Sequence, residues 1–312
     1  GEWPERARVE LEAAARELAG YFDAPVPITV LAEWKAISGD TVGTGGPGQL
    51  HRNFPNAPRQ DVLYPPALAN QLAGRRLNTT GGADVQTAYN SNTNFYFGRD
   101  AKGPTGTEDF YTTVMHEVIH GMGFLGTMVV ADGVGRWGDE DGMVNPSNHG
   151  HAHHHGARGA TSAIPPGLKE LNRHLLEDHF VPLSSYRVPT QGGTVYPDIF
   201  DQFVVSGAGV RLIDTSVFAN NSPALAAQIQ SNNLFWSGPA ASAANGGQRP
   251  KLYAPNPFES GSSVGHLDEA TFDKPSNPNA MLAPRGSNVT SVKVGSVILG
   301  IMADLGWRTR QP

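Results

Sequence analysis

Apolar side chains recur at helical spacing in several stretches of the chain, with polar residues between them. Capping residues mark some of the ends: Gly74 closes one stretch and Ser222 opens another. A further helix is expected between "TGTEDF" and "GFLGT", where Thr105 and Glu108 have the spacing of a capping box. The other expected helices cover residues 4–21, 65–74, 165–179, 222–233 and 294–307.

Shorter runs that are rich in β-branched and aromatic residues predict strands. One is "PITVLAEWKAI" (27–37), and residues 83–100 predict two strands joined by the turn-forming "NSNTN". Residues 196–214 predict a strand, a turn and a second strand. The glycine-rich "GDTVGTGGPGQL" and the stretch from 127 to about 165 predict loops.

These elements predict an α+β fold in a single domain, residues 1–312. We expect an N-terminal subdomain (1–126) with a twisted sheet, and a loop-rich C-terminal subdomain (127–312) that closes a cleft. The 37 glycines and 24 prolines fit long shaped loops better than a helical bundle.

Charge and composition exclude several kinds of partner and site. The net charge is −6 and no basic stripe is present, so nucleic acid is not an expected partner. No apolar run reaches the roughly 18–20 residues of a membrane span. The chain has no cysteine, so a metal ion would have to be held by His, Asp, Glu or carbonyl groups.

The stretch "TTVMHEVIHGMGFLGT" (112–127) contains the candidate metal ligands and the candidate general base. On a helix, His116 and His120 lie on one face about one turn apart, so both can reach one metal ion. Glu117 can act on a metal-activated water as general base, because it lies beside the first ligand without being one itself. The pattern HExxH on a helix is the signature of a zinc metalloprotease.

Two histidines are too few, because a catalytic zinc usually has three protein ligands and a water. In the extended pattern HExxHxxGxxH a third histidine would stand at position 126, where this chain has Gly126. His266 in "SSVGHLDEATF", fifteen residues before Met281 in "NAMLAP", is the favoured third ligand. A glutamate ligand, as in gluzincins, is the alternative, with Glu140 and Glu269 as candidates.

The order of these motifs resembles the metzincin zinc endopeptidases of the leishmanolysin-like group. In that group a long insertion separates HExxHxxG from the third histidine, and a Met-turn follows. The resemblance implies zinc at His116, His120 and His266, with Met281 in the turn beneath the metal. It also implies a secreted enzyme whose leader has been removed.

Two departures from the wider group limit what carries over. A tyrosine often follows the Met-turn methionine by two residues, but Ala283 stands there. Stabilisation of the transition state must then come from elsewhere. Latency through a propeptide cysteine is excluded within this chain, which has none.

Other polar clusters are candidates for metal sites or surface features. Asp132, Asp139 and Asp141 in "DGVGRWGDEDG" offer the oxygen ligands that calcium favours, although acidic loops without a metal are common. The histidines of "NHGHAHHHGA" (148–156) could bind a second metal, but a solvated loop is favoured. Asp198 and Asp201 are expected in a turn or on the surface.

The function predicted from the sequence is hydrolysis of peptide bonds in a protein or peptide. Substrate is expected to lie extended along an edge strand, for which "NTNFYFG" is the candidate. The rivals are a non-catalytic zinc-binding adhesin or toxin-like module and a metal-dependent glycan or amide hydrolase. Glu117 argues against the first rival, because a purely structural site needs no general base.

Overall fold

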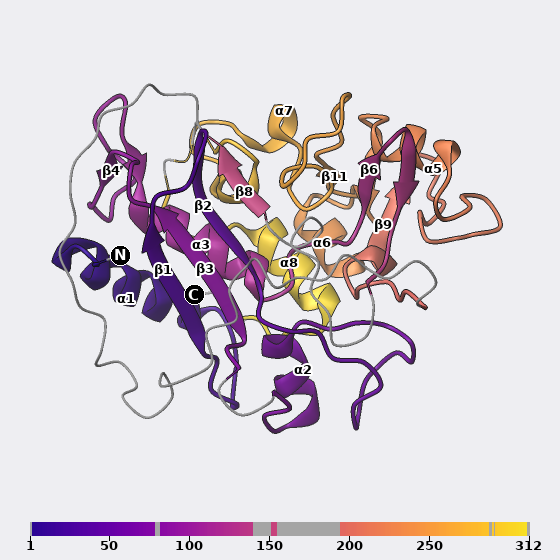
Figure 1. Ribbon diagram of the computed structural model, residues 1–312, viewed down its shortest axis with the longest axis horizontal. Coiled ribbons are helices and arrows are strands. Elements are labelled where there is room, and N and C mark those ends of the chain that lie inside the picture. The colour runs from indigo at the N-terminus through magenta and orange to yellow at the C-terminus, as the bar shows by residue number, and fades with distance from the viewer. Residues whose placement is uncertain are drawn as a thin grey trace.

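The computed structural model describes residues 2–78, 82–139, 151–154, 194–286, 289 and 291–310, with residues 151–154 described by their backbone. They form a mixed α/β structure with small sheets (Figure 1). The largest sheet has four strands, β1 (Val30–Lys35), β2 (Thr41–Pro47), β3 (Val85–Asn90) and β8 (His151–His154), in the order β1-β3-β2-β8. β1 and β3 are parallel, whereas β2 is antiparallel to both of its neighbours.

β2 corrects the expectation of a glycine-rich loop. Its glycines let helix α3 (Phe110–Gly121) approach the sheet more closely than side chains would allow. A Cβ built on Gly45 would lie 2.1 Å from the carbonyl oxygen of Glu117. The glycine content therefore reflects contact with the helix that carries the motif, and the prediction of a loop was wrong.

The helices α1 (Glu5–Gly20) and α2 (Pro66–Ala73) confirm their predicted stretches. α1 packs along α3, and an aromatic cluster joins α3 to the sheet. Phe110 is its centre, with ring centroids 5.1 Å from Tyr89 and 5.0 Å from Phe95. α2 ends at Gly74 in the left-handed conformation, as its sequence predicts.

The C-terminal half is less regular and adds several short elements. Helices α5 (Pro223–Ile229) and α8 (Ser296–Leu305) confirm predictions, and Ser222 caps α5. The structure adds a sheet of β9 (Val204–Ser206), β10 (Leu234–Trp236) and β11 (Lys251–Leu252), together with α6 (Pro239–Ala244), α7 (Glu269–Phe272) and the 3₁₀ turns η2 (Asp201–Phe203) and η3 (Pro278–Leu282). Of the strand pair predicted in 196–214, β9 is present and Arg211 makes only an isolated bridge to Val205.

Two further expectations in the middle of the chain change. Residues predicted as loop form the hairpin β6 (Val129–Ala131) and β7 (Val134–Arg136), because Asp132 and Gly133 both adopt positive φ at its turn. Residues 151–154, expected in a solvated loop, form strand β8 on β2. The helix expected at 165–179 lies outside the described residues.

One hydrophobic core includes residues of both halves of the chain. Phe124, just after α3, lies 5.5 Å from Phe200 between ring centroids, and Phe200 lies 4.7 Å from Trp236. The motif helix is thus enclosed by the sheet on one side and by the C-terminal half on the other. None of the described helices is both long and apolar enough to cross a membrane.

Candidate metal centre

Helix α3 places the motif in the interior, and every one of its residues is buried. Its N-cap is Asp109, whose carboxylate accepts a hydrogen bond from the backbone N–H of Thr112 at 2.8 Å. The expected capping box of Thr105 and Glu108 was wrong, because Glu108 still belongs to strand β5 (Glu108–Asp109), which pairs with β4 (Phe95–Tyr96). The helix therefore begins later than its sequence predicts.

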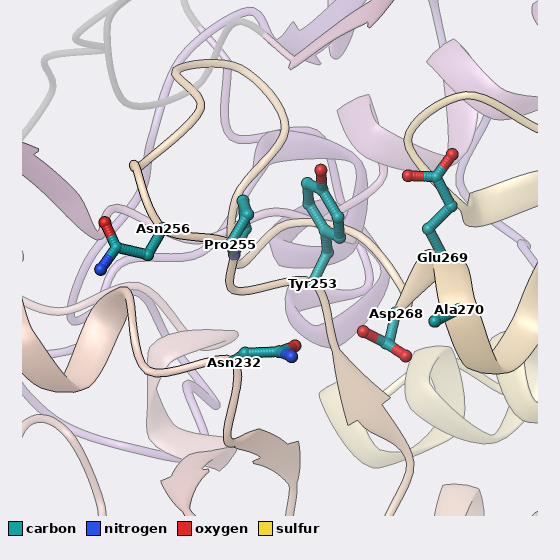
Figure 2. Close-up of a pocket in the computed structure, with 7 residues that line it drawn as sticks. All are labelled: Asn232, Tyr253, Pro255, Asn256, Asp268, Glu269 and Ala270. Atoms are coloured by element: carbon teal, nitrogen blue, oxygen red, sulfur yellow. The ribbon is translucent and has the colours of Figure 1, made fainter.

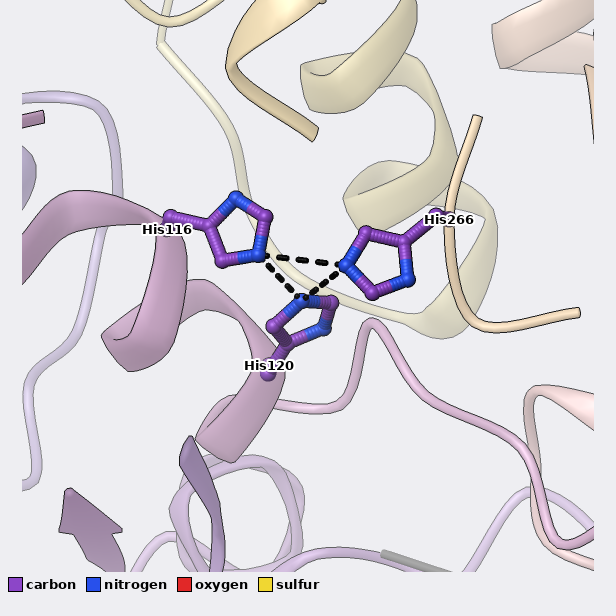
Figure 3. A group of neighbouring side chains, drawn as sticks. All are labelled: His116, His120 and His266. Carbon is purple, nitrogen blue, oxygen red and sulfur yellow. Dashed lines mark hydrogen bonds between the residues drawn. The ribbon is translucent and has the colours of Figure 1, made fainter. Parts of the chain in front are cut away.

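The structure brings His116, His120 and His266 together (Figure 3). The Nε2 atom of His120 lies 2.9 Å from that of His116 and 3.2 Å from that of His266. The third separation, between His116 and His266, is also 3.2 Å. Nitrogens bound to one zinc ion in a tetrahedron at about 2.0–2.1 Å would be about 3.3–3.4 Å apart, so the spacing is close to that of a metal site.

The opposite ring nitrogen of each histidine is held by a backbone carbonyl. His116 Nδ1 lies 2.5 Å from the oxygen of Met281, His120 Nδ1 lies 2.7 Å from that of Phe124, and His266 Nδ1 lies 2.8 Å from that of Ser262. A carbonyl can only accept, so each Nδ1 carries the hydrogen and each Nε2 directs a lone pair inward. Three converging lone pairs repel one another unless a cation or a proton lies between them, and this donor set suits a zinc ion.

The three carbonyls come from separate parts of the chain. Met281 is buried in η3, and its backbone carbonyl oxygen accepts the hydrogen bond from His116 Nδ1. Phe124 returns to His120 because Gly123 adopts a φ of 122° in the turn after α3. The sequence did not identify Phe124 or Ser262, because they act through backbone atoms that carry no residue-specific signal.

Glu117 directly follows His116 in the chain and is fully buried. Neither of its carboxylate oxygens has a hydrogen-bond partner among the described residues. Burial raises the pKa of this carboxyl well above its usual value, because the charged form loses solvation. The side chain lies against β2, where a Cβ built on Gly43 would be 3.0 Å from Glu117 Oε1.

The other residues considered as metal ligands are not gathered here. Among the described residues, the three histidines are the only group of three or more metal-ligating side chains. Glu269 instead pairs with Arg285 at 2.5 Å. Asp132 is exposed at the hairpin turn, and Asp139 is buried where its backbone pairs with that of Tyr196.

The remaining candidates lie partly or wholly outside the described residues. These are Glu140, Asp141, His149 and His155. His151, His153 and His154 lie in β8, which is described by its backbone.

The stretch predicted as the substrate edge contains β4, which is not a strand of the four-stranded sheet. Phe95 and Tyr96 pair with β5 in a separate two-stranded sheet. The strand that borders Glu117 is β2, through Gly43 and Gly45. β2 is an interior strand of the four-stranded sheet, between β3 and β8.

Asp198 and Asp201, which were expected in a turn or on the surface, form a buried hydrogen-bonded group next to Gly126. Asp201 is fully buried, and its carboxylate accepts hydrogen bonds from the N–H and the hydroxyl of Thr127 and from the N–H of Asp198. A Cβ built on Gly126 would lie 2.7 Å from Asp201 Oδ1. The expectation of a turn is met at Asp201, which begins η2, whereas the expectation of a surface position was wrong, because both aspartates are buried.

A cavity of about 600 Å³ lies beside the segment that carries His266 (Figure 2). Its lining residues are Asn232, Tyr253, Pro255, Asn256, Asp268, Glu269 and Ala270. Two of its carboxylates are already paired, Asp268 with Lys251 and Glu269 with Arg285. The cavity contains none of the three histidines and does not contain Glu117.

Comparison with known proteins yields one partial match. A family model described as SPBPB7E8-like matches residues 57–132, less than half of the chain. The matched part includes α3 and ends well before His266. No curated protein matches the chain, and no solved structure does.

Proposed function

We propose that this chain is a zinc-dependent endopeptidase, with His116, His120 and His266 as metal ligands and Glu117 as general base. The observation that supports the metal centre best is the inward direction of three Nε2 lone pairs, set by three carbonyl acceptors. His266 is favoured over Glu269 as third ligand, because it lies with the other two histidines whereas Glu269 is engaged by Arg285.

Zinc, when bound, supplies a Lewis acid and lowers the pKa of the water that attacks the substrate carbonyl. Glu117 would take the proton of that water and pass it to the leaving amine. The position of Glu117 next to a metal ligand on the same helix brings acid–base chemistry to the metal.

The substrate would be an extended peptide paired with β2. Peptides commonly add to strand edges through backbone hydrogen bonds, and the glycines of β2 bring its backbone next to Glu117. By resemblance, we place the enzyme with the leishmanolysin-like metzincins and expect it to be secreted. Met281 would then be the Met-turn residue.

The function is tested by cleavage of casein and of a peptide library by the intact protein. We expect cleavage that is lost on chelation and restored by zinc. If the protein binds zinc but cleaves no peptide bond, it is a binding module or acts on another substrate. For the third ligand, His266→Ala should bind zinc much more weakly than the parent, and equal affinity would show that another residue takes this place.

A further inference from the structure

Strand β2 has both of its edges occupied. β3 pairs with one edge and β8 with the other, and β8 runs antiparallel to β2 (Figure 1). The register places His151 opposite Gly45, Ala152 opposite Thr44, and His153 opposite Gly43. β8 belongs to the long segment between the second and third histidines of the metal centre.

The part of β2 that β8 covers is the part that borders the candidate base. Built Cβ atoms at Gly43 and Gly45 would lie 3.0 Å from Oε1 and 2.1 Å from the carbonyl oxygen of Glu117. These two glycines are register partners of β8. Glu117 itself is fully buried in this arrangement.

A strand can pair with only two neighbours, one on each side, because each edge carries one row of N–H and C=O groups. A peptide substrate that adds to β2 would need the edge that β8 now holds. We propose that residues 151–154 occupy the substrate edge of β2, so that the chain in this fold is a latent form. This inference rests on the proposed peptidase function and names its regulation: β8 must leave β2 before a peptide can bind beside Glu117.

A disulfide between the two strands tests the proposal, since the chain has no cysteine of its own. Thr44 and Ala152 are directly opposite each other, at a Cα separation of about 4.5–5.5 Å in antiparallel sheets, which a disulfide can span. Thr44 also alternates with Gly43 and Gly45, so its side chain points away from α3. In Thr44→Cys/Ala152→Cys, oxidation should lock β8 in place.

We expect the oxidised double variant to lose cleavage of a fluorogenic peptide and the reduced double variant to recover the rate of the Thr44→Cys single variant. Each single variant is the control and should not respond to oxidation. If the oxidised protein, with its disulfide verified by mass, cleaves as fast as the reduced form, the proposal is overturned. If the reduced form and the parent cleave nothing, the peptidase function itself fails.

A variant that weakens the pairing of β8 with β2 should raise the rate of cleavage instead of lowering it. Ala152→Pro fixes φ near about −65°, away from the φ of about −140° in an antiparallel strand, whereas Ala152→Val favours a strand. If β8 is paired in about nine molecules of ten, its release should raise kcat/KM about tenfold. Hydrogen exchange across residues 41–47 should also become faster in Ala152→Pro than in Ala152→Val. Unchanged exchange in a folded Ala152→Pro protein would contradict the pairing.

Discussion

The turn at Gly123 affects both the stability of the fold and the orientation of the metal ligand His120. Replacement of Gly123 by alanine should therefore lower both folding stability and zinc affinity. Its φ is 122°, and a Cβ built there would lie 3.0 Å from Cγ of Pro65. The turn at Gly123 brings the carbonyl of Phe124 to 2.7 Å from His120 Nδ1. Gly123→Ala should therefore strain the turn and withdraw the acceptor that orients His120.

Two magnitudes follow from this geometry. Holding a non-glycine residue at such a φ costs on the order of 1–3 kcal/mol of folding free energy. Loss of a partner that orients a metal ligand typically lowers metal affinity by about 10–100-fold. That loss corresponds to about 1.4–2.7 kcal/mol of binding free energy, since each 1.4 kcal/mol is about tenfold.

Gly74→Ala is the matched control. Gly74 also has a positive φ, 67°, but it closes α2 and has no atom within 4 Å of a built Cβ. Thermal unfolding of the metal-free proteins should show that both variants are destabilised. Competition with a chromophoric chelator should show weaker zinc binding in Gly123→Ala alone. Zinc affinity in Gly123→Ala that is indistinguishable from that of Gly74→Ala would refute the role of the turn.

Three further predictions address the surroundings of the site. Gly45→Ala places a Cβ 2.1 Å from a backbone oxygen of α3 and should lower the free energy of unfolding in urea by at least about 1–3 kcal/mol. Gly20→Ala is the control, because nothing lies within 4 Å of its built Cβ. Equal urea midpoints for the two variants would contradict the close packing of β2 on α3. Asp201→Asn should lower the free energy of unfolding by about 1–3 kcal/mol, because an amide cannot accept hydrogen bonds from every donor that faces this carboxylate. The free energy of unfolding of the exposed control Asp132→Asn should stay within about 0.5 kcal/mol of that of the parent. Burial raises the pKa of Glu108 to about 7, so its contribution to stability is present below its usual pKa of 4.5 and is lost as the pH rises through 7. Glu108→Gln should therefore raise the melting temperature, relative to the parent, more at pH 8 than at pH 5, and an equal gain at both values would contradict the raised pKa.

Local signals in the sequence predict the parts of the fold that local chemistry decides. Gly74 ends α2 because glycine adopts the left-handed conformation easily, and Ser222 begins α5 by accepting the N–H of Leu225. β2 was missed for the opposite reason. Gly43 and Gly45 have the composition of a loop, and only the approach of α3 gives them their place in a sheet.

The candidate site likewise contains residues that local spacing predicts and residues that depend on tertiary structure. His116, Glu117 and His120 follow from spacing on a helix, whereas His266 lies 146 residues after His120 and depends on tertiary structure. The order of the sequence motifs pointed to His266, and the structure brings it to the other two histidines. Asp201 was misjudged, because nothing in its own neighbourhood predicts a partner 74 residues away at Thr127.

In the proposed function, Glu117 moves protons at a metal ion held by three histidines. The most direct measurement compares kcat/KM for one peptide substrate between the parent and Glu117→Gln at equal zinc content. Glutamine keeps the shape of the side chain but cannot act as a base, so we expect unchanged zinc content and a rate lower by about 10²–10⁴. Cleavage by zinc-loaded Glu117→Gln at the parent rate would contradict the account.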